Sequence, residues 1–404
     1  MNKRVRAVAD RLLPRGTRRR QVVGRLVFIV RLLAGWTGAE PLAREQLRRI
    51  AASARAPKVC ILSGCGGDSR RYRCDHAVEA LHEVGAEAVV VPLEGTDLDK
   101  QRAELVAAFD VLVFQRACWT PQLGLLVAAA RRARKLVFFE TDDLTFDPFA
   151  EVHRLAGPGR LLREVDIVGQ HATLRICLAA CASTEFLAEA LARHSCSAEV
   201  IRNGFSAEML AGARRAVRVE SPRVVIGYGS GTPTHDRDFE VAAGALAVIL
   251  AKYPETELHL VGHLEPGPRL SAWRGRVVRH ALVPWRELPA RLARFDVNLA
   301  PFETEVAFCQ AKSELKYLEA ALVGVPTVAS PLPAYRHAIR HGENGFLAAD
   351  EAGWVAALEA LVQSVELRRR VGEAARAHVL AAYAPAARGA DWLRALARLR
   401  AACL

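Results

Sequence analysis

Two lysines and a glutamate share one expected helix in the stretch "CQAKSELKYLEAALVGVPTVAS", residues 309–330. The apolar spacing predicts a helix over residues 313–323, with Lys312 and Lys316 at its first turn and Glu319 one turn later. Because the exposed N–H groups of a helix start carry partial positive charge, two cations there are unfavourable without an anion. A surface pair of Lys316 with Glu319 is the alternative, and it leaves Lys312 unexplained. We therefore interpret this helix start as an anion-binding site.

A second candidate site follows an expected strand in "GYGSGTPTHDRDF", residues 227–239. Its small and polar residues are, in order, Gly229, Ser230, Gly231, His235, Asp236, Arg237 and Asp238. A loop of small residues before a helix can hold a pyrophosphate on backbone N–H groups and place a cation against it. Asp236 or Asp238 as a plain helix cap is the alternative interpretation.

The stretch "SGCGGDSRRYR", residues 63–73, is a third candidate because its glycines let backbone N–H groups approach a ligand closely. Gly66 and Gly67 precede Arg71, but the spacing does not fit G-x-G-x-x-G, so a dinucleotide site is not indicated. Two interpretations stay open here. One is a tight turn with solvated arginines, and the other is a loop that contacts a phosphate or a polar acceptor.

A fourth candidate is "ETDDLTFDP", residues 140–148, where Asp142 and Asp143 follow an expected strand directly. Adjacent carboxylates at a strand end can cap the next turn, contact an acceptor, serve as a general base or bind a divalent cation. We favour capping or an acceptor or base contact over a metal, because no third carboxylate lies nearby at ligand spacing.

The elements that must position these side chains alternate between strands and helices. The expected strands are residues 58–63, 86–92, 110–115, 135–141, 175–183 and 198–203, then 223–231, 257–262, 276–283, 296–302, 326–330 and 345–348. Helical periodicity lies between them, for example over residues 72–84, 121–134, 184–194, 238–252 and 286–294. This pattern predicts two doubly wound α/β units, that is, two Rossmann-like domains facing a cleft. Ligands of such sheets bind beyond the carboxyl ends of the strands, where all four candidate sites lie.

The chain divides by this pattern into five segments. We expect a basic helical extension over residues 1–56, a first Rossmann-like domain over 57–205, a linker over 206–222, a second domain over 223–375 and C-terminal helices over 376–404. With 404 residues, 51% hydrophobic and 25% charged, the chain can bury two cores of ordinary size. The nine cysteines are scattered without metal or disulfide spacing, so we expect a reducing compartment.

The net charge of +12 is concentrated in residues 1–56, where fourteen Lys and Arg face three acidic residues. The apolar run in this extension is interrupted by Arg25 and Arg31, which is unsuited to a spanning helix. A helix packed on the protein, a helix on an anionic membrane surface and an export signal remain as interpretations, the last disfavoured by Arg31. No nucleic-acid motif follows, so a nucleic-acid partner is not expected.

These stretches resemble GT-B glycosyltransferases similar to family 4, the glycosyl transferases group 1. The resemblance is carried by "KSELKYLEAALVGVPTVAS", with its glutamate and its Gly-x-Pro-x-x-Ala-Ser ending, and by "VIRNGF", "IGYGSGTPTHDRDF", "STEFLAEAL" and "HGENGFLA". It covers roughly residues 58–385. The glutamate that usually stands eight residues before Glu319 is Ala311 here, so the E-x7-E motif is incomplete.

Position by position, the resemblance implies that Glu319 binds the ribose hydroxyls of a nucleotide. Residues 311–315, including Ser313, would approach the sugar and diphosphate of the donor, beside the loop of Gly229, Ser230, Gly231 and His235. The acceptor side would be lined by Gly66, Gly67, Arg71, Asp142 and Asp143. Cleavage of a glycosyl–phosphate bond builds negative charge on the leaving diphosphate, which fixed cations stabilise. We assign catalytic roles to Lys312, Lys316, Arg237 and Asp143.

The function expected from this resemblance is transfer of a sugar from a nucleotide-sugar to a glycan, lipid-linked or other cell-envelope acceptor in a bacterium. Retention of configuration and no metal or other cofactor are implied by the same resemblance. We expect a cytoplasmic hexosyltransferase, at the inner face of the membrane if residues 1–56 contact lipid. A catalytically inactive glycan- or nucleotide-binding subunit and another GT-B enzyme, such as a sugar-nucleotide epimerase, are the alternatives.

Overall fold

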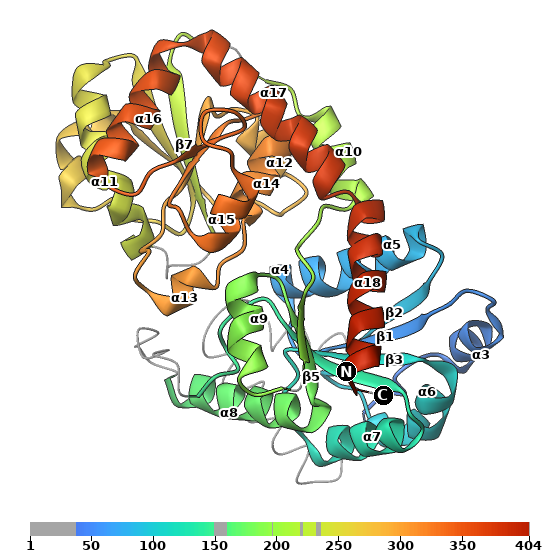
Figure 1. Cartoon of the computed structure of the whole chain (residues 1–404). Coiled ribbons are helices and arrows are strands. Elements are labelled where there is room, and N and C mark those ends of the chain that lie inside the picture. Colours follow the sequence, from blue (N-terminus) through green and yellow to red (C-terminus); the bar gives the residue numbers. More distant parts are fainter. Residues whose placement is uncertain (1–37, 149–159, 196, 219–220, 232–235, 404) are drawn as a thin grey trace, which may run out of the picture.

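The first domain of the computed structural model is a six-stranded parallel sheet covered by helices on both faces (Figure 1). The model describes residues 38–148, 160–195, 197–218, 221–231 and 236–403. The strand order is β2-β1-β3-β4-β5-β6. The strands are β1 (Lys58–Ser63), β2 (Glu87–Pro92), β3 (Val111–Gln115), β4 (Leu136–Thr141), β5 (Ala179–Ala182) and β6 (Ser197–Val200). Because β1, β3, β4 and β5 are buried on both faces, they read as nearly continuous apolar runs.

The helices of this domain connect successive strands. They are α3 (Arg44–Ala52), α4 (Gly67–Arg70), a π-helix (Arg71–Asp75), α5 (His76–Glu83), a 3₁₀ turn (Leu98–Gln101), α6 (Arg102–Ala108), α7 (Pro121–Arg132), α8 (Arg160–Cys177) and α9 (Glu185–Ala192). Thr120 and Thr184 cap α7 and α9, each accepting a hydrogen bond from a backbone N–H of the first turn. These caps fix where the chain leaves a strand end and turns into a helix.

The second domain repeats this plan with the strand order β12-β11-β10-β7-β8-β9. Its strands are β7 (Val224–Ser230), β8 (Thr256–Gly262), β9 (Val277–His280), β10 (Val297–Ala300), β11 (Thr327–Ala329) and β12 (Phe346–Leu347). Its helices are α11 (Asp236–Lys252), a 3₁₀ segment (Pro268–Arg276), α12 (Leu288–Leu292), α13 (Ala307–Gln310), α14 (Leu315–Leu322), α15 (Pro333–Ala338), α16 (Glu351–Gln363) and α17 (Val365–Ala382). The predicted pair of doubly wound α/β domains is thereby confirmed.

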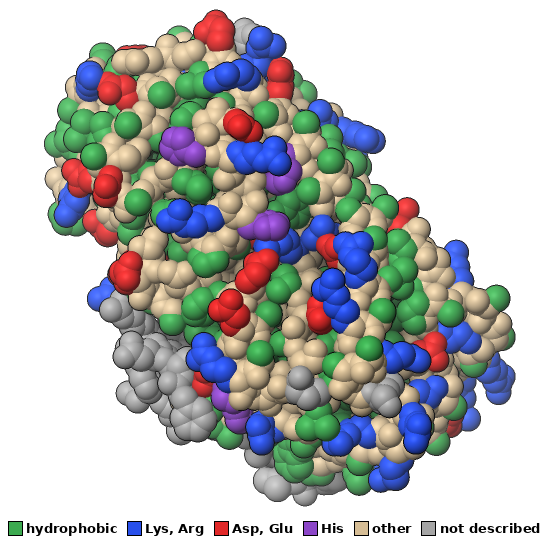
Figure 2. Space-filling view, in the orientation of Figure 1, with side chains coloured by type: hydrophobic (Ala, Val, Ile, Leu, Met, Phe, Trp, Pro, Cys, Tyr) green, Lys and Arg blue, Asp and Glu red, His purple; other side chains and the backbone are tan. Residues whose placement is uncertain are grey.

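The chain crosses between the domains twice. The first crossing carries α10 (Ala207–Arg215), so the expected linker contains a helix that packs against α12. The second crossing follows α17, and α18 (Pro385–Cys403) returns to lie along α5 of the first domain (Figure 1). Trp392 of α18 is buried there against Phe138 of β4. Figure 2 shows the result as two lobes with charged side chains of both signs at their junction.

Three local expectations are wrong. Residues 175–177 were expected in a strand but form the end of α8. The helix ends where Leu178 adopts a positive φ of 69°. Lys312 is not in the first turn of a helix: α13 ends at Gln310, and α14 begins only at Leu315. The helix expected over residues 286–294 is the shorter α12, which begins one residue before Pro289. Residues 1–37 of the expected N-terminal extension lie outside the described residues.

Candidate functional site

The first wall of the candidate site is the loop after β1. A side chain on Gly64 would meet the backbone carbonyl of Arg116 at 2.4 Å, so only glycine lets the loops after β1 and β3 lie against each other. Gly66 precedes α4 and Gly67 has a positive φ of 69°. A Cβ atom added to either glycine would meet no other atom within 4 Å. These two predicted acceptor-side glycines therefore present bare backbone toward the space beyond the sheet.

A π-helix follows this loop and orients three consecutive side chains. π-helical turns are rare and occur often at functional sites. Arg71 pairs with Asp68 at 3.0 Å, and its guanidinium lies over the rings of Tyr72 (4.3 Å) and Trp285 (4.7 Å). Arg73 is fully buried and donates from Nε to Glu140 at 2.6 Å. Arg71 thus lies against Trp285 of the second domain, and no contact joins it to Asp142, the other charged residue predicted on the acceptor side, among the described residues.

The two aspartates after β4 face different partners. Asp142 accepts a hydrogen bond from Ser69 at 2.7 Å and lies 3.6 Å from Nη1 of Arg116. Arg116 has a positive φ of 44°, an uncommon backbone conformation for a non-glycine residue. Asp143 instead contacts the second domain, because Nζ of Lys312 donates to both of its carboxylate oxygens at 3.1 and 3.2 Å. Asp143 also accepts a hydrogen bond from the N–H of Leu144, which agrees with the capping interpretation. Contact with an acceptor or action as a general base stays a prediction.

The second wall is built by the segment between α13 and α14. Figure 1 shows α13 reaching toward α9 of the first domain, and Ala311 after it is fully buried in that domain's core. Thr184, at the start of α9, donates to the carbonyl of Ala311 at 3.4 Å. Lys312 is the next residue, and its Nζ pairs with the carboxylate of Asp143 in the first domain. Ala311, where the resemblance led us to expect a glutamate, is therefore an interdomain packing position in this structure.

Lys316 contacts the other donor-side loop. Its Nζ donates to the carbonyl of Gly229 at the end of β7 and lies 4.8 Å from the ring centroid of Tyr228. Burial lowers the pKa of Lys316, and Glu319 opposes that shift. Space around Gly229 and Gly231 is open to 4 Å, while Ser230 is buried. The lysine and the small-residue loop that were predicted separately thus lie together beyond the strand ends.

The Glu319 carboxylate accepts a hydrogen bond from the first domain. The hydroxyl of Tyr72 donates to its Oε1 at 2.6 Å. Burial raises the pKa of Glu319, whereas the Tyr72 hydrogen bond and the charges of Arg71 and Lys316 lower it. Tyr72 was expected only as the start of a helix, although an aromatic residue among three arginines after a strand end is a signal that could have marked it.

A buried polar chain connects the two domains beside this contact. Arg73 donates from Nη1 to Oδ1 of Asn203 at 2.9 Å, and Nδ2 of Asn203 donates to Oγ of Ser313 at 2.9 Å. Burial raises the pKa of Glu140 to about 7, although Arg73 opposes the shift. Ser313, which was predicted to approach the donor, is therefore hydrogen-bonded to Asn203 of the first domain.

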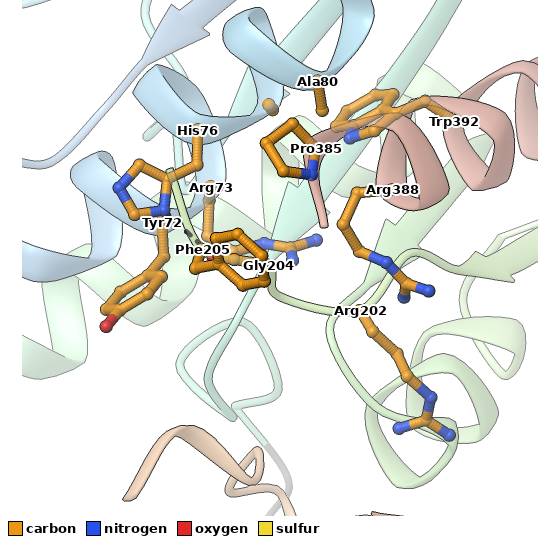
Figure 3. Close-up of a pocket in the computed structure, with 11 residues that line it drawn as sticks. Tyr72, Arg73, His76, Ala80, Arg202, Gly204, Phe205, Pro385, Arg388 and Trp392 are labelled. Carbon is orange, nitrogen blue, oxygen red and sulfur yellow. Dashed lines mark hydrogen bonds between the residues drawn. The ribbon is translucent and has the colours of Figure 1, made fainter. Parts of the chain in front are cut away.

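The junction between the first domain and the two connecting segments, called the hinge below, is closely packed. A cavity of about 10 Å³ lies there, lined by Arg73, His76, Arg202, Arg388 and Trp392 among others. In Figure 3 the Tyr72 hydroxyl points away from the other labelled side chains. Glu314 accepts from the hydroxyl of Tyr383 at 2.7 Å and lies 3.6 Å from Arg202. Most of these side chains are large and buried, so this junction is well packed.

No contact joins the predicted catalytic residue Arg237 to Lys312, Lys316 or Glu319 among the described residues. Arg237 is exposed at the start of α11, and no ion pair of Arg237 occurs among the described residues. His235 lies outside the described residues. Asp238, next along α11, is buried and accepts from the thiol of Cys309 at 3.2 Å, which supports its interpretation as a structural residue.

In the part of the chain that the structure describes, no three potential metal ligands of the Asp, Glu, His or Cys type lie together. The described helices also include none with the length and apolar run needed to cross a bilayer. Eight of the nine cysteines are described, and all eight are free thiols. Burial raises the pKa of Cys60, Cys74, Cys177 and Cys181, so these thiols remain protonated at neutral pH.

Comparisons with known proteins identify relatives of this fold. Residues 223–364 match the family model described as glycosyl transferases group 1. Structures of similar fold include HepE from Anabaena, solved with UDP and glucose (15% identity, 84% of this chain and 99% of that one, TM-score 0.56), and a sucrose-phosphate synthase from Thermosynechococcus elongatus (16%, 85% and 99%, 0.55). A glycosyltransferase from Rickettsia africae is also similar (13%, 85% and 98%, 0.59). A sequence search of curated proteins finds no significant match.

These matches confirm the resemblance seen in the sequence. The chain has the GT-B fold over both domains, and its second domain, which holds Lys312, Lys316 and Glu319, matches the group 1 glycosyl transferases. At this low identity the structural neighbours establish the fold alone. The activity has to be argued from the site.

Proposed function

We propose that this GT-B protein, whose second domain matches the glycosyl transferases group 1, transfers a sugar from a nucleoside diphosphate sugar to a glycan, lipid-linked or other cell-envelope acceptor. The observation that carries the proposal is the meeting of Lys316 with the Gly229 loop at the strand ends of the second domain, with Lys312 and Glu319 on the same segment. HepE, of the same fold, has been solved with UDP-glucose, which supports a nucleotide-sugar as the donor.

The roles follow from charge. Lys312 and Lys316 neutralise the diphosphate as the glycosyl–phosphate bond breaks, and the glycines at positions 229 and 231 let the diphosphate approach the backbone closely. Glu319 accepts hydrogen bonds from the ribose. Asp143 lies within reach of Lys312 across the cleft, so an acceptor hydroxyl placed near the diphosphate would find this carboxylate beside it. We propose that the reaction retains configuration and uses no metal.

The proposal is tested with UDP-, GDP- and dTDP-sugars, each with and without EDTA, by thermal unfolding and by nucleotide release with glycan and lipid extracts. A ligand at 100 times its Kd stabilises the protein by about 2.7 kcal/mol, which raises Tm measurably. We expect stabilisation by one nucleotide family and acceptor-dependent release that EDTA leaves intact.

Each other result has a definite meaning. Stabilisation without release or sugar modification favours the inactive binding subunit, and a modified sugar nucleotide without an acceptor favours an epimerase. Loss of release in EDTA contradicts metal independence. If none of the sugar nucleotides stabilises the protein, the proposed function is wrong.

A further inference from the structure

We propose that Tyr72 of the first domain is a positioning residue for the donor nucleoside: its hydroxyl holds Glu319 so that the carboxylate accepts hydrogen bonds from the ribose of a ribonucleoside diphosphate. This inference rests on the proposed function and adds a residue of the opposite domain to the donor site. Recognition of the ribose is then complete only when the two domains meet.

The geometry of the pair fits this role. The hydroxyl of Tyr72 lies 2.6 Å from Oε1 of Glu319, the short distance of a charge-assisted hydrogen bond. A carboxylate offers about four acceptor positions on two oxygens, so one bond to Tyr72 leaves several for a vicinal diol. Glu319 is partly buried on α14, and among the described residues only Tyr72 donates a hydrogen bond to it. The carboxylate is thereby oriented without being saturated.

The ring of Tyr72 is itself held from several sides. The side chain is 4% exposed, and the ring packs edge-on against His76 with centroids 4.9 Å apart. The guanidinium of Arg71 lies between this ring and that of Trp285 in the second domain. Cation–π contacts of this kind are stronger away from solvent, and Arg71 is largely buried. Tyr72 is therefore a rigid support, and Trp285 ties that support to the second domain.

The charged and titratable groups that face Glu319 are Tyr72, Arg71, Lys316, Asp68 and Tyr335. Tyr72, Arg71 and Lys316 favour the ionised carboxylate, and Asp68 opposes it. The ionised form is the one that accepts from both ribose hydroxyls. Without the Tyr72 hydroxyl, the carboxylate takes up a proton at a higher pH, so ribose binding should be lost at a higher pH as the solution is acidified.

A second tyrosine provides a matched control. Tyr383 donates to the buried Glu314 at 2.7 Å at the hinge, the same chemistry between a tyrosine and a glutamate but away from the proposed nucleoside end. Tyr72→Phe and Tyr383→Phe each delete one hydroxyl. Any general effect of losing a buried tyrosine–glutamate hydrogen bond should appear in both variants, and an effect on the ribose should appear only in Tyr72→Phe.

The test measures binding of UDP, GDP and ADP and of their 2′-deoxy counterparts by calorimetry from pH 5 to 8. For the nucleotide that wild type binds, we expect Tyr72→Phe to lower affinity about 10-fold, as a lost charge-assisted hydrogen bond does. The preference for ribo- over deoxyribonucleotide should shrink, and the acid limb of binding should move to higher pH. Tyr383→Phe should leave the preference and the acid limb at their wild-type positions.

The outcomes separate the two proposals. If wild type binds none of the three nucleotides and no dTDP-sugar, the proposed function fails. If wild type binds only a dTDP-sugar, whose sugar is a deoxyribose, the proposed function stands and this inference fails. If wild type binds one of them and Tyr72→Phe matches it in affinity, sugar preference and pH profile, this inference alone fails. It also fails if both tyrosine variants lose ribo- and deoxyribonucleotide affinity equally, because Tyr72 then has a structural role only.

Discussion

Lys312 and Lys316 are four residues apart in sequence, but they contact different parts of the cleft. Lys312 pairs with Asp143 of the first domain, and Lys316 bonds to the strand-end loop of its own domain. The break between α13 and α14 separates them, since Lys312 has no helical turn to keep it beside Lys316. Their mutual repulsion is reduced by these separate partners, and a diphosphate between them would replace Asp143 as the counter-charge for Lys312.

This arrangement makes a prediction for Lys312. We expect Lys312→Ala to weaken binding of the nucleoside diphosphate sugar about 10- to 100-fold, the range for a charged hydrogen bond of roughly 1.5 to 3 kcal/mol. The loss should be smaller at high salt, because added ions screen the wild-type attraction. Calorimetric titration at two salt concentrations measures both effects.

Arg237→Ala is the control for this experiment, because Arg237 is exposed and carries a charge of the same sign on α11. The sequence analysis assigned Arg237 a catalytic role, but this side chain is exposed, so we expect less than a 3-fold effect. Equal effects of the two variants would mean that the overall positive charge of the domain binds the donor, and not a positioned lysine.

Helix α5 and the first crossing segment meet at a titratable contact. Nδ1 of His76 lies 3.0 Å from the carbonyl of Gly204, and burial lowers the pKa of His76 to about 4. Arg71 lowers this pKa further, and Asp68 and Glu208 oppose the shift. The folded protein therefore holds His76 neutral, whereas the unfolded chain protonates it near pH 6.5.

The sign of the pH effect follows. Between pH 6.5 and 4 the unfolded chain binds the extra proton, so His76 contributes stability above pH 6.5 that is lost as the pH falls toward 4, roughly 3 kcal/mol in all. His76→Asn keeps a donor near the Nδ1 position but does not titrate. We expect denaturant unfolding to show a flatter fall of stability with acid for this variant, and the wild-type slope for His337→Asn on the exposed side of α15. An unchanged slope in His76→Asn would contradict a buried, neutral His76 in the folded protein.

The elements that the sequence predicts well are those whose burial is complete. "KVCILS" and "KLVFFET" are central strands covered on both faces, so their apolar runs match β1 and β4 within one residue. The sequence analysis predicted a linker where α10 lies, because the residues up to Pro222 are polar and have no strand pattern. Only Met209 and Ala213 are buried on this helix, so its apolar face is a weak signal. The sequence analysis missed the break before α14 because Ala311 is buried against the first domain. Its contact there, Thr184, lies 127 residues away in the sequence, and a local hydrophobic period does not reveal such a contact.

The same distance in sequence limits prediction of the site. Lys312, Lys316 and Glu319 were found from their spacing on one segment, but their partners Asp143, Gly229 and Tyr72 come from other strand ends. Parallel sheets bring strand ends to one edge, which predicted that these loops would lie near one another. Which donor meets which acceptor depends on how the two domains dock, and the sequence pattern of either domain alone does not contain that information.

At the scale of the whole molecule, the C-terminal helix completes the first domain although it follows the second in sequence. Trp392 of α18 is 2% exposed and packs in the first-domain core cluster, while Trp354 of α16 is fully buried in the second. The two domains are therefore joined by two connecting segments, one containing α10 and one between α17 and α18. This predicts that the stability of the first domain depends on residues beyond 384.

The matched variants Trp392→Ala and Trp354→Ala test this dependence, since each removes a buried indole at a cost of about 3 to 5 kcal/mol. Hydrogen exchange read by peptide should show lost protection over β1–β6 and α5 for Trp392→Ala, and over β7, β8, β10 and β11 for Trp354→Ala. A sugar nucleotide bound mainly by the second domain should still protect β7 and α14 in Trp392→Ala. If Trp392→Ala instead loosens both sheets equally, the two domains unfold as one unit, and the hinge packing around Arg202 and Arg388 is strong enough to couple them.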